Sequence, residues 1–155
     1  MNKLEKMEQE AFDNNVNIYS YYLGGENLKG LYFNGNIAIN TSVNKTDEKT
    51  CTIAEEMGHH HTTVGDILDM TKSWNRKQER QARLWAYNKL IGLTGLIQAY
   101  EHGCQNLYET ADFLEVTEEV LSDAIECYRD KYGVGVIVDN YYVMFIPNLQ
   151  VLKMF

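Results

Sequence analysis

The sequence contains little cysteine and lacks long apolar runs. Its three cysteines, Cys51, Cys104 and Cys127, lie far apart and include no CxxC pair. This spacing argues against a disulfide framework and a thiolate zinc site, and it favours a reducing cytoplasm. No run of about 18 apolar residues occurs, and the N-terminal segment has no apolar core of the kind that signal peptides need. We therefore expect a soluble cytoplasmic protein without a signal peptide or a membrane-spanning helix.

Basic residues are also scarce, with 14 Lys and Arg against 22 Asp and Glu, a net charge of -8 and a pI near 4.9. Such a charge repels phosphates, so we expect neither direct nucleic-acid binding nor membrane attachment. The stretch from Leu90 to Tyr128 has no Lys or Arg. Its acidic residues are Glu101, Glu109, Asp112, Glu115, Glu118, Glu119, Asp123 and Glu126. Although part of this stretch has the spacing of a DNA-reading helix pair, its charge favours a basic protein partner or a merely solvated surface.

The sequence does contain a clear periodicity of hydrophobic residues. Its 155 residues are 45% hydrophobic, which is enough to form one domain with a core. Between residues 16 and 40, β-branched and aromatic residues around glycines predict a small sheet with a hairpin turn at Asn34-Gly35. Asp139-Asn140 is expected to be the turn of a C-terminal hairpin. Helical spacing predicts helices over 3–13, from about 51 to Gly65-Asp66, and over 77–92, 93–103, 106–116 and 117–133. The sequence therefore predicts an α+β fold.

The segment CTIAEEMGHHHTTVGD, Cys51–Asp66, carries the residues with the most chemical interest. On a helix Glu55 and His59 lie on one face and can point at the same ion, while Glu56 reaches a water beside it. The pattern is H-E-x-x-H with a glutamate in place of the first histidine. In the standard motif two imidazoles hold zinc and the glutamate takes a proton from the attacking water.

A third metal ligand must come from elsewhere in the chain. Glu79, twenty residues after His59, is the best candidate, because the next predicted helix would return it over the first one. Asp66 and His60 are the alternatives. Successive helical residues are about 100° apart, so His59, His60 and His61 cannot all bind one ion. We expect His60 to lie beside the metal ligands or at the rim of the site. Because so short a motif also arises by chance, a solvated polar helix is the alternative interpretation.

The run CTIAEEMGHHHTTVGDIL, followed by ERQARLWAYNKLI, resembles the ImmA/IrrE family of metallo-endopeptidases of phages, prophages and other bacterial mobile elements. The preceding GLYFNGNIAIN and the segment LYETADFLEVTEEVLSDAIECYRDKYG resemble the flanking parts of that family. The likeness extends from about Val16 to the end of the chain. The family usually has H-E-x-G-H and then E-x-x-A-x-x-F-A; this sequence has E-E-M-G-H from Glu55 and E-x-x-A-x-x-W-A from Glu79.

For the fold, the resemblance implies a zincin-like helical core with a small N-terminal sheet and a C-terminal hairpin. It implies a single metallopeptidase-like domain over residues 1–155. In that domain, about 16–92 would carry the sheet and the active-site helices, 93–133 a helical substrate-recognition part, and 134–155 the terminal hairpin.

For the function, the resemblance implies a zinc endopeptidase in the bacterial cytoplasm that cleaves a helix-turn-helix repressor of the same phage or mobile element. Glu56 would be the general base, and Glu55, His59 and Glu79 the zinc ligands. Glu55 stands where the family more often has histidine, and its negative charge would make zinc a weaker Lewis acid. The alternative is therefore a noncatalytic anti-repressor that binds the repressor and keeps a degenerate metal site.

Overall fold

The structure, a computed structural model, describes residues 1–25, 27–62 and 73–155, with the side chains of 73–75 excepted. These residues divide into two compact units, Met1–Ala86 and Tyr87–Phe155, which are described separately as unit 1 and unit 2. Both units combine helices with a sheet, which confirms the predicted α+β fold. The assignment of the whole chain to a single domain stays a prediction. Within the part described, none of the helices has the length and apolar character needed to cross a bilayer.

Unit 1 contains a three-stranded sheet in the order β1-β3-β2. Its elements are α1 (Lys3–Asp13), β1 (Asn17–Tyr21), β2 (Gly30–Phe33), β3 (Asn36–Asn40), α2 (Thr46–Thr62) and the first part of α3 (Ser73–Leu90). Strands β2 and β3 form the predicted hairpin, with Asn34 and Gly35 at φ values of 46° and 77° in its turn. Strand β1 pairs in parallel with β3, a pairing that the sequence pattern did not predict.

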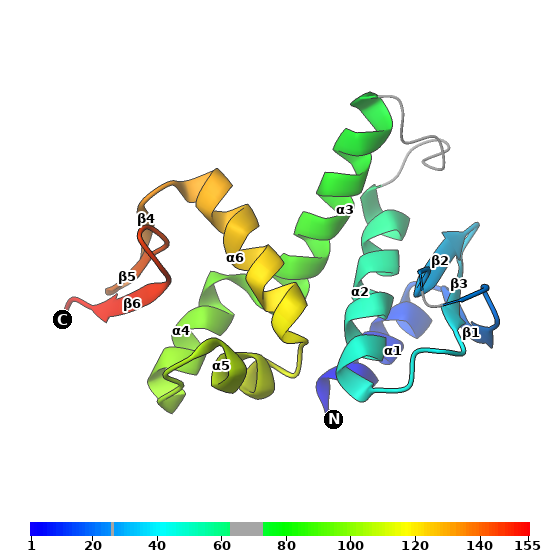
Figure 1. The fold of residues 1–155 in the computed structure, drawn as a ribbon, viewed down its shortest axis with the longest axis horizontal. Helices are drawn as coiled ribbons and strands as arrows, with labels where there is room; N and C mark the ends of the chain where they lie inside the picture. The colour runs from blue at the N-terminus through cyan, green and yellow to red at the C-terminus, as the bar shows by residue number, and fades with distance from the viewer. Residues whose placement is uncertain (26, 63–72) are drawn as a thin grey trace. The chain divides into compact units, whose positions relative to one another are not determined.

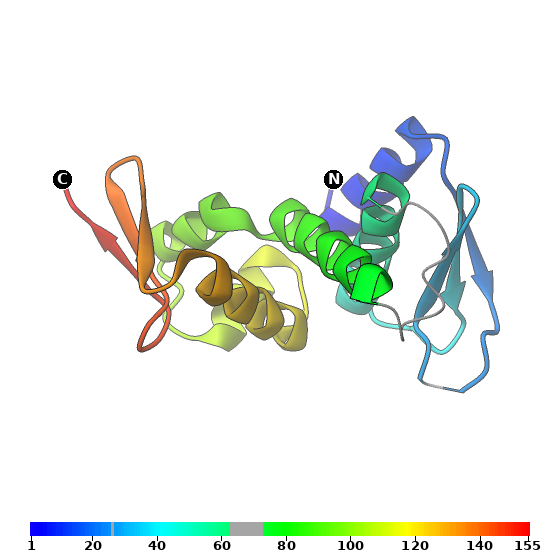
Figure 2. The same cartoon turned by 90° about the horizontal axis from the view of Figure 1, so that it is seen from above.

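Helix α2 lies at the centre of unit 1. Both α1 and α2 cover the same face of the sheet, and α2 contacts α1, β2 and β3 (Figures 1 and 2). Its residues Ile53, Ala54 and Met57 are buried, as the helical spacing predicts, and Ile37 and Ile39 of β3 are buried with them. Each large aliphatic side chain removed from water in this way stabilises the fold by roughly 1.5–3 kcal/mol. The position of α2 is thus fixed on several sides.

Unit 2 contains the three helices predicted for this part of the chain. Its elements are the end of α3, α4 (Gly92–His102), α5 (Leu107–Leu114), α6 (Glu118–Tyr132), β4 (Gly135–Val138), β5 (Tyr141–Met144) and β6 (Gln150–Lys153). Thr117 caps α6 as predicted, because its hydroxyl accepts the N–H of Val120. The terminal hairpin is confirmed, with Asp139 at a φ of 54° in its turn, but β6 extends it to a three-stranded antiparallel sheet. Only Val151 of β6 is buried. The strand therefore shows little of the alternation between buried and exposed residues from which a strand is predicted.

Candidate active site

Gly58 sets how closely α2 and α3 approach in unit 1. A Cβ atom at this position would overlap the carbonyl oxygen of Ala82 and lie 2.9 Å from its carbonyl carbon. Only glycine leaves room for such an approach of two backbones. The close approach brings His59, the residue after Gly58, together with Glu79, which lies about one turn before Ala82. The prediction that these two helices pack together is confirmed.

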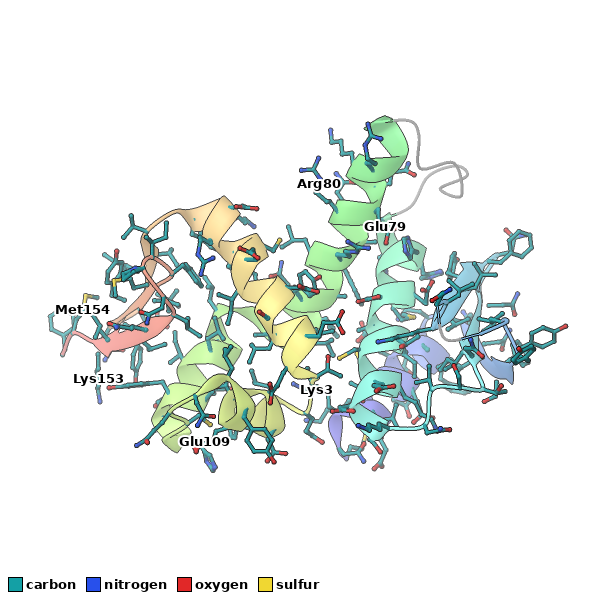
Figure 3. All side chains as sticks on the ribbon, viewed as in Figure 1. Lys3, Glu79, Arg80, Glu109, Lys153 and Met154 are labelled. Atoms are coloured by element: carbon teal, nitrogen blue, oxygen red, sulfur yellow. The ribbon has the colours of Figure 1, made fainter. Side chains whose placement is uncertain are left out.

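His59 and Glu79 form a polar contact between the two helices. The His59 Nε2 and Glu79 Oε2 atoms are 3.2 Å apart. Figure 3 shows Glu79 on the side of α3 that faces α2, with Arg80 on the opposite side. Burial by itself would lower the pKa of His59, but the hydrogen bond with Glu79 and the charges of the nearby glutamates raise that pKa overall. The same hydrogen bond lowers the pKa of Glu79, so the pair is stabilised in its charged form.

Arg83 holds the second oxygen of the Glu79 carboxylate. Its Nε atom lies 3.4 Å from Glu79 Oε1, one helical turn further along α3. Because the Arg83 side chain is 55% exposed, we expect this ion pair to contribute little to stability and to act mainly by orienting the carboxylate. Sequence reasoning did not single out Arg83, although its spacing of four residues from Glu79 is a recognisable signal.

Glu56, the predicted general base, is half-buried beside this pair. Burial raises the pKa of its carboxyl to about 7; the positive charge of His59 opposes the shift, and the negative charge of Glu55 adds to it. The backbone N–H of Tyr32 donates a hydrogen bond to the carboxylate and also favours the ionised form. A carboxyl group with a pKa near neutrality can both accept and return a proton at physiological pH.

Tyr32 of β2 also contacts His60. Its hydroxyl lies 2.7 Å from His60 Nδ1, and the same oxygen accepts the N–H of Gly35 at 3.0 Å. Since His60 follows Glu56 by four residues, the two form one row of α2 that faces β2. Glu55 and His59 form the neighbouring row on α2, and His59 contacts α3. Sequence reasoning missed Tyr32, because only the folding of the sheet onto α2 brings it here.

Among the described residues, neither Glu55 nor His60 completes a three-donor metal site with the His59–Glu79 pair. Glu55 is half-buried, and burial raises its pKa, opposed mainly by the positive charge of Arg83. The ring of His60 is hydrogen-bonded to Tyr32 instead of Glu79. Asp66, together with the predicted helix end at Gly65-Asp66, lies outside the described residues.

The donor set fits zinc by chemical type, because zinc binds imidazole nitrogen and carboxylate oxygen. His59 and Glu79 supply one donor of each kind. Within residues 1–25, 27–62 and 73–155, however, no group of three His, Cys, Asp or Glu side chains could hold a metal ion. A complete site would need a third donor, for which Glu55, His60 and Asp66 are the predicted candidates.

A half-buried carboxylate beside an imidazole–carboxylate pair is compatible with part of the active site of a metal-dependent hydrolase. Sequence comparison agrees with that class: the model of the IrrE N-terminal-like domain, Peptidase_M78, matches residues 11–126. The chain therefore belongs to the ImmA/IrrE family of metallopeptidases. The match includes all of α2 and α3 and ends within α6, before the terminal sheet. A search of curated proteins finds no match to the chain.

Proposed function

We propose that the protein is a zinc-dependent endopeptidase in which His59 and Glu79 hold the metal and Glu56 is the general base. The observation that carries this proposal is the meeting of His59 and Glu79 at 3.2 Å from two separate helices, directly beside Glu56. A solvated polar helix would have no reason to bury these groups together, since burying charged groups is costly without a partner or a function.

The chemistry of the reaction follows from the groups around Glu56. His59 and Glu79 would hold the zinc ion, which when bound would supply Lewis acidity toward a peptide carbonyl and a water molecule. The Glu56 carboxylate accepts a proton from the attacking water and returns it to the leaving amine, a task suited to its pKa of about 7. The Tyr32 N–H keeps the carboxylate in place, and Arg83 orients Glu79 toward His59.

As substrate we propose a helix-turn-helix repressor encoded on the same phage or mobile element, cleaved in the cytoplasm of the bacterial host. Family membership and the acidic surface of unit 2 support this choice, because DNA-binding proteins carry basic surfaces.

The first experiment measures the metal. Protein purified without a histidine tag is analysed for bound metal, as wild type and as His59→Ala. We expect stoichiometric zinc in the wild type and a loss in the variant. If neither preparation retains zinc or a related ion after zinc is added and excess is removed, the peptidase proposal is wrong.

The second experiment measures cleavage. The purified repressor is incubated with zinc-loaded protein, and fragments are identified by mass spectrometry. Glu56→Gln should keep zinc and produce no fragments, while Glu48→Gln, on the same helix but outside the site, should cleave as the wild type does. Fragments formed by Glu56→Gln at the wild-type rate would rule out Glu56 as the base.

One observation favours a second function, that of a noncatalytic anti-repressor. The part of the chain that the structure describes has no three-donor group, and Glu55 stands where the family more often has histidine. A protein of this kind would release the repressor from DNA and leave it intact. Derepression without fragments, unchanged in Glu56→Gln, would select this function over the peptidase.

A further inference from the structure

Unit 2 contains a groove between its helices and the terminal sheet, far along the chain from the residues of the candidate active site. It encloses about 580 Å³ and is lined by residues of α4, α5, α6 and the segment that leads into β6. Much of its lining is apolar, including Leu96, Leu107, Ile125, Leu149 and Val151. Leu107 is 43% exposed, so apolar surface remains open to solvent in this groove.

Several polar side chains of the groove have hydrogen-bond or ion-pair partners within unit 2. The Gln150 amide donates to Asn148, and the Asn106 side chain accepts the N–H that begins α5. Arg129 is held on two sides, by the Glu126 carboxylate at 3.2 Å and by the Phe145 carbonyl at 3.2 Å. A site for a small polar ligand needs convergent polar groups with free bonding capacity. This groove instead offers mainly apolar surface, and several of its polar side chains already have partners in unit 2.

The helices around the groove carry more carboxylates than cations, and Arg129, which lines the groove, is paired with Glu126. All eight carboxylates between Leu90 and Tyr128 are exposed, and that stretch contains no Lys or Arg. Glu126 lines the groove and has a side chain that is 72% exposed. On α6, Glu118 and Ser122 precede Glu126 at intervals of four residues, so the carboxylates of Glu118 and Glu126 border the same helix face as the lining residue Ser122.

We propose that this groove binds an amphipathic helix of a partner protein, with the apolar side of the helix in the groove and Lys or Arg residues on its flanks. Helices commonly bind in apolar grooves through residues spaced three and four apart, and opposite charge around the contact speeds association and excludes wrong partners. The inference rests on the proposed function only for the identity of the partner, since the groove would recognise this segment in the repressor. Its binding requires neither zinc nor Glu56.

The test uses a fluorescent synthetic peptide of about 18 residues, made of Leu on one helical face and Lys elsewhere, with binding to the full chain followed by anisotropy in EDTA. We expect affinity to fall by roughly tenfold or more between low and high salt. A peptide with Glu in place of Lys, and one with the same composition but scrambled spacing, should both bind at least about tenfold more weakly. Equal binding of either peptide would overturn the proposal.

Matched variants separate the groove from the general charge of the protein. Leu107→Ser should weaken binding by roughly tenfold, whereas Leu28→Ser in unit 1, where the leucine is similarly exposed at 44%, should have no effect. Glu126→Lys and Glu8→Lys change the net charge equally, but only Glu126→Lys should weaken binding by more than about threefold. Equal responses within either pair would show that the groove is not the binding site. Melting curves confirm that each variant is folded.

Two further outcomes would assign the groove to another occupant and overturn the proposal. The first is binding of a short labelled DNA duplex to the protein that Leu107→Ser weakens; the second is a concentration-dependent dimer that Leu107→Ser abolishes. The proposed peptidase activity and the proposed groove can be disproved independently of each other. Peptide binding with no repressor cleavage would remove the peptidase and keep the groove, while cleavage by Leu107→Ser at the wild-type KM would remove the groove and keep the peptidase.

Discussion

The two units use the same residue type, the carboxylate, in opposite environments. In unit 1, Glu55 and Glu56 are half-buried, Glu79 contacts His59, and burial or that contact shifts their pKa values. In unit 2, the eight carboxylates of the stretch from Leu90 to Tyr128 are all exposed. Burial strengthens electrostatic interactions and makes unpaired charge costly, whereas exposed charge is screened by water and salt.

This difference separates chemistry from recognition. A buried carboxylate can be tuned for proton transfer or metal binding, while an exposed acidic surface acts over longer distances on a charged partner. Substitutions in unit 1 should therefore change metal affinity, stability and catalysis, and substitutions of the unit 2 carboxylates should change only partner binding. Four predictions test or refine this contrast, beginning with the largest expected effect.

Removing the carboxylate of Glu79 should have the largest effect. Glu79→Gln leaves His59 without its charged partner, and we expect zinc affinity to fall by roughly a hundredfold or more. Glu119→Gln in unit 2 should leave zinc affinity unchanged; both are measured by competition with a zinc-binding dye. Glu55→Gln, tested in the same way, examines the third ligand: a comparable loss assigns Glu55, and an unchanged affinity leaves that place to Asp66 or His60. Unchanged affinity in Glu79→Gln would exclude Glu79 as a ligand.

Adding a methyl group at Gly58 should disturb the site through the backbone. In Gly58→Ala the new Cβ overlaps Ala82, so the helices must move apart, at a cost of about 1–3 kcal/mol in the free energy of unfolding. Gly25→Ala is the matched control, because a Cβ there meets no atom within 4 Å. Chemical denaturation and zinc titration of both variants measure the effect. A Gly58→Ala protein with wild-type stability and zinc affinity would contradict the close packing of α2 on α3.

In EDTA, stability should decrease as the pH rises from about 5 to about 8. Folded Glu56, with a pKa of about 7 against 4.5 as a model value, keeps its proton in a range where the unfolded chain has lost it. The raised pKa of His59 acts in the same direction, because its stabilising charge is lost as the pH rises through that pKa. Together we expect a loss on the order of 2 kcal/mol, measured by urea denaturation.

Glu56→Gln should flatten this pH profile, since it removes the larger of the two contributions. Glu119→Gln should retain the wild-type profile. Stability that increases over this pH range in EDTA would contradict the buried, protonated state of Glu56. Zinc should reverse the trend, because its binding competes with protons at its ligands.

The smallest effect is expected at Tyr32. Tyr32→Phe removes the hydroxyl that contacts His60 but keeps the backbone N–H that binds Glu56, so it should cost about 1 kcal/mol of stability. Tyr108→Phe in unit 2, where the tyrosine is 68% exposed, should cost nothing measurable by thermal denaturation. Equal melting temperatures for the two variants would show that the Tyr32–His60 contact does not stabilise the site.

Local signals in the sequence predicted much of this fold. The turn at Asn34-Gly35 needs residues that tolerate positive φ, and the cap of α6 needs a hydroxyl such as that of Thr117. The parallel pairing of β1 with β3 and the addition of β6 were not predicted, because they depend on contacts between residues far apart in the chain. Strand β6 in particular has only Val151 buried.

The candidate site shows the same limit. The spacing of Glu55, Glu56 and His59 on a helix is a local property, and the contact of His59 with Glu79 followed from the expected packing of two adjacent helices. The contacts of Tyr32 depend on where the sheet lies against α2, which no local pattern encodes. The roles of Glu55, His60 and Asp66 toward a metal stay predictions.

The family match ends at residue 126, yet one wall of the groove is built from residues 148–152. That wall lies outside the matched part of the chain and outside the helices that carry His59 and Glu79. If the groove binds a partner as proposed, exchanging only the terminal sheet for that of another protein of this family should change partner binding and leave the His59–Glu79 contact intact.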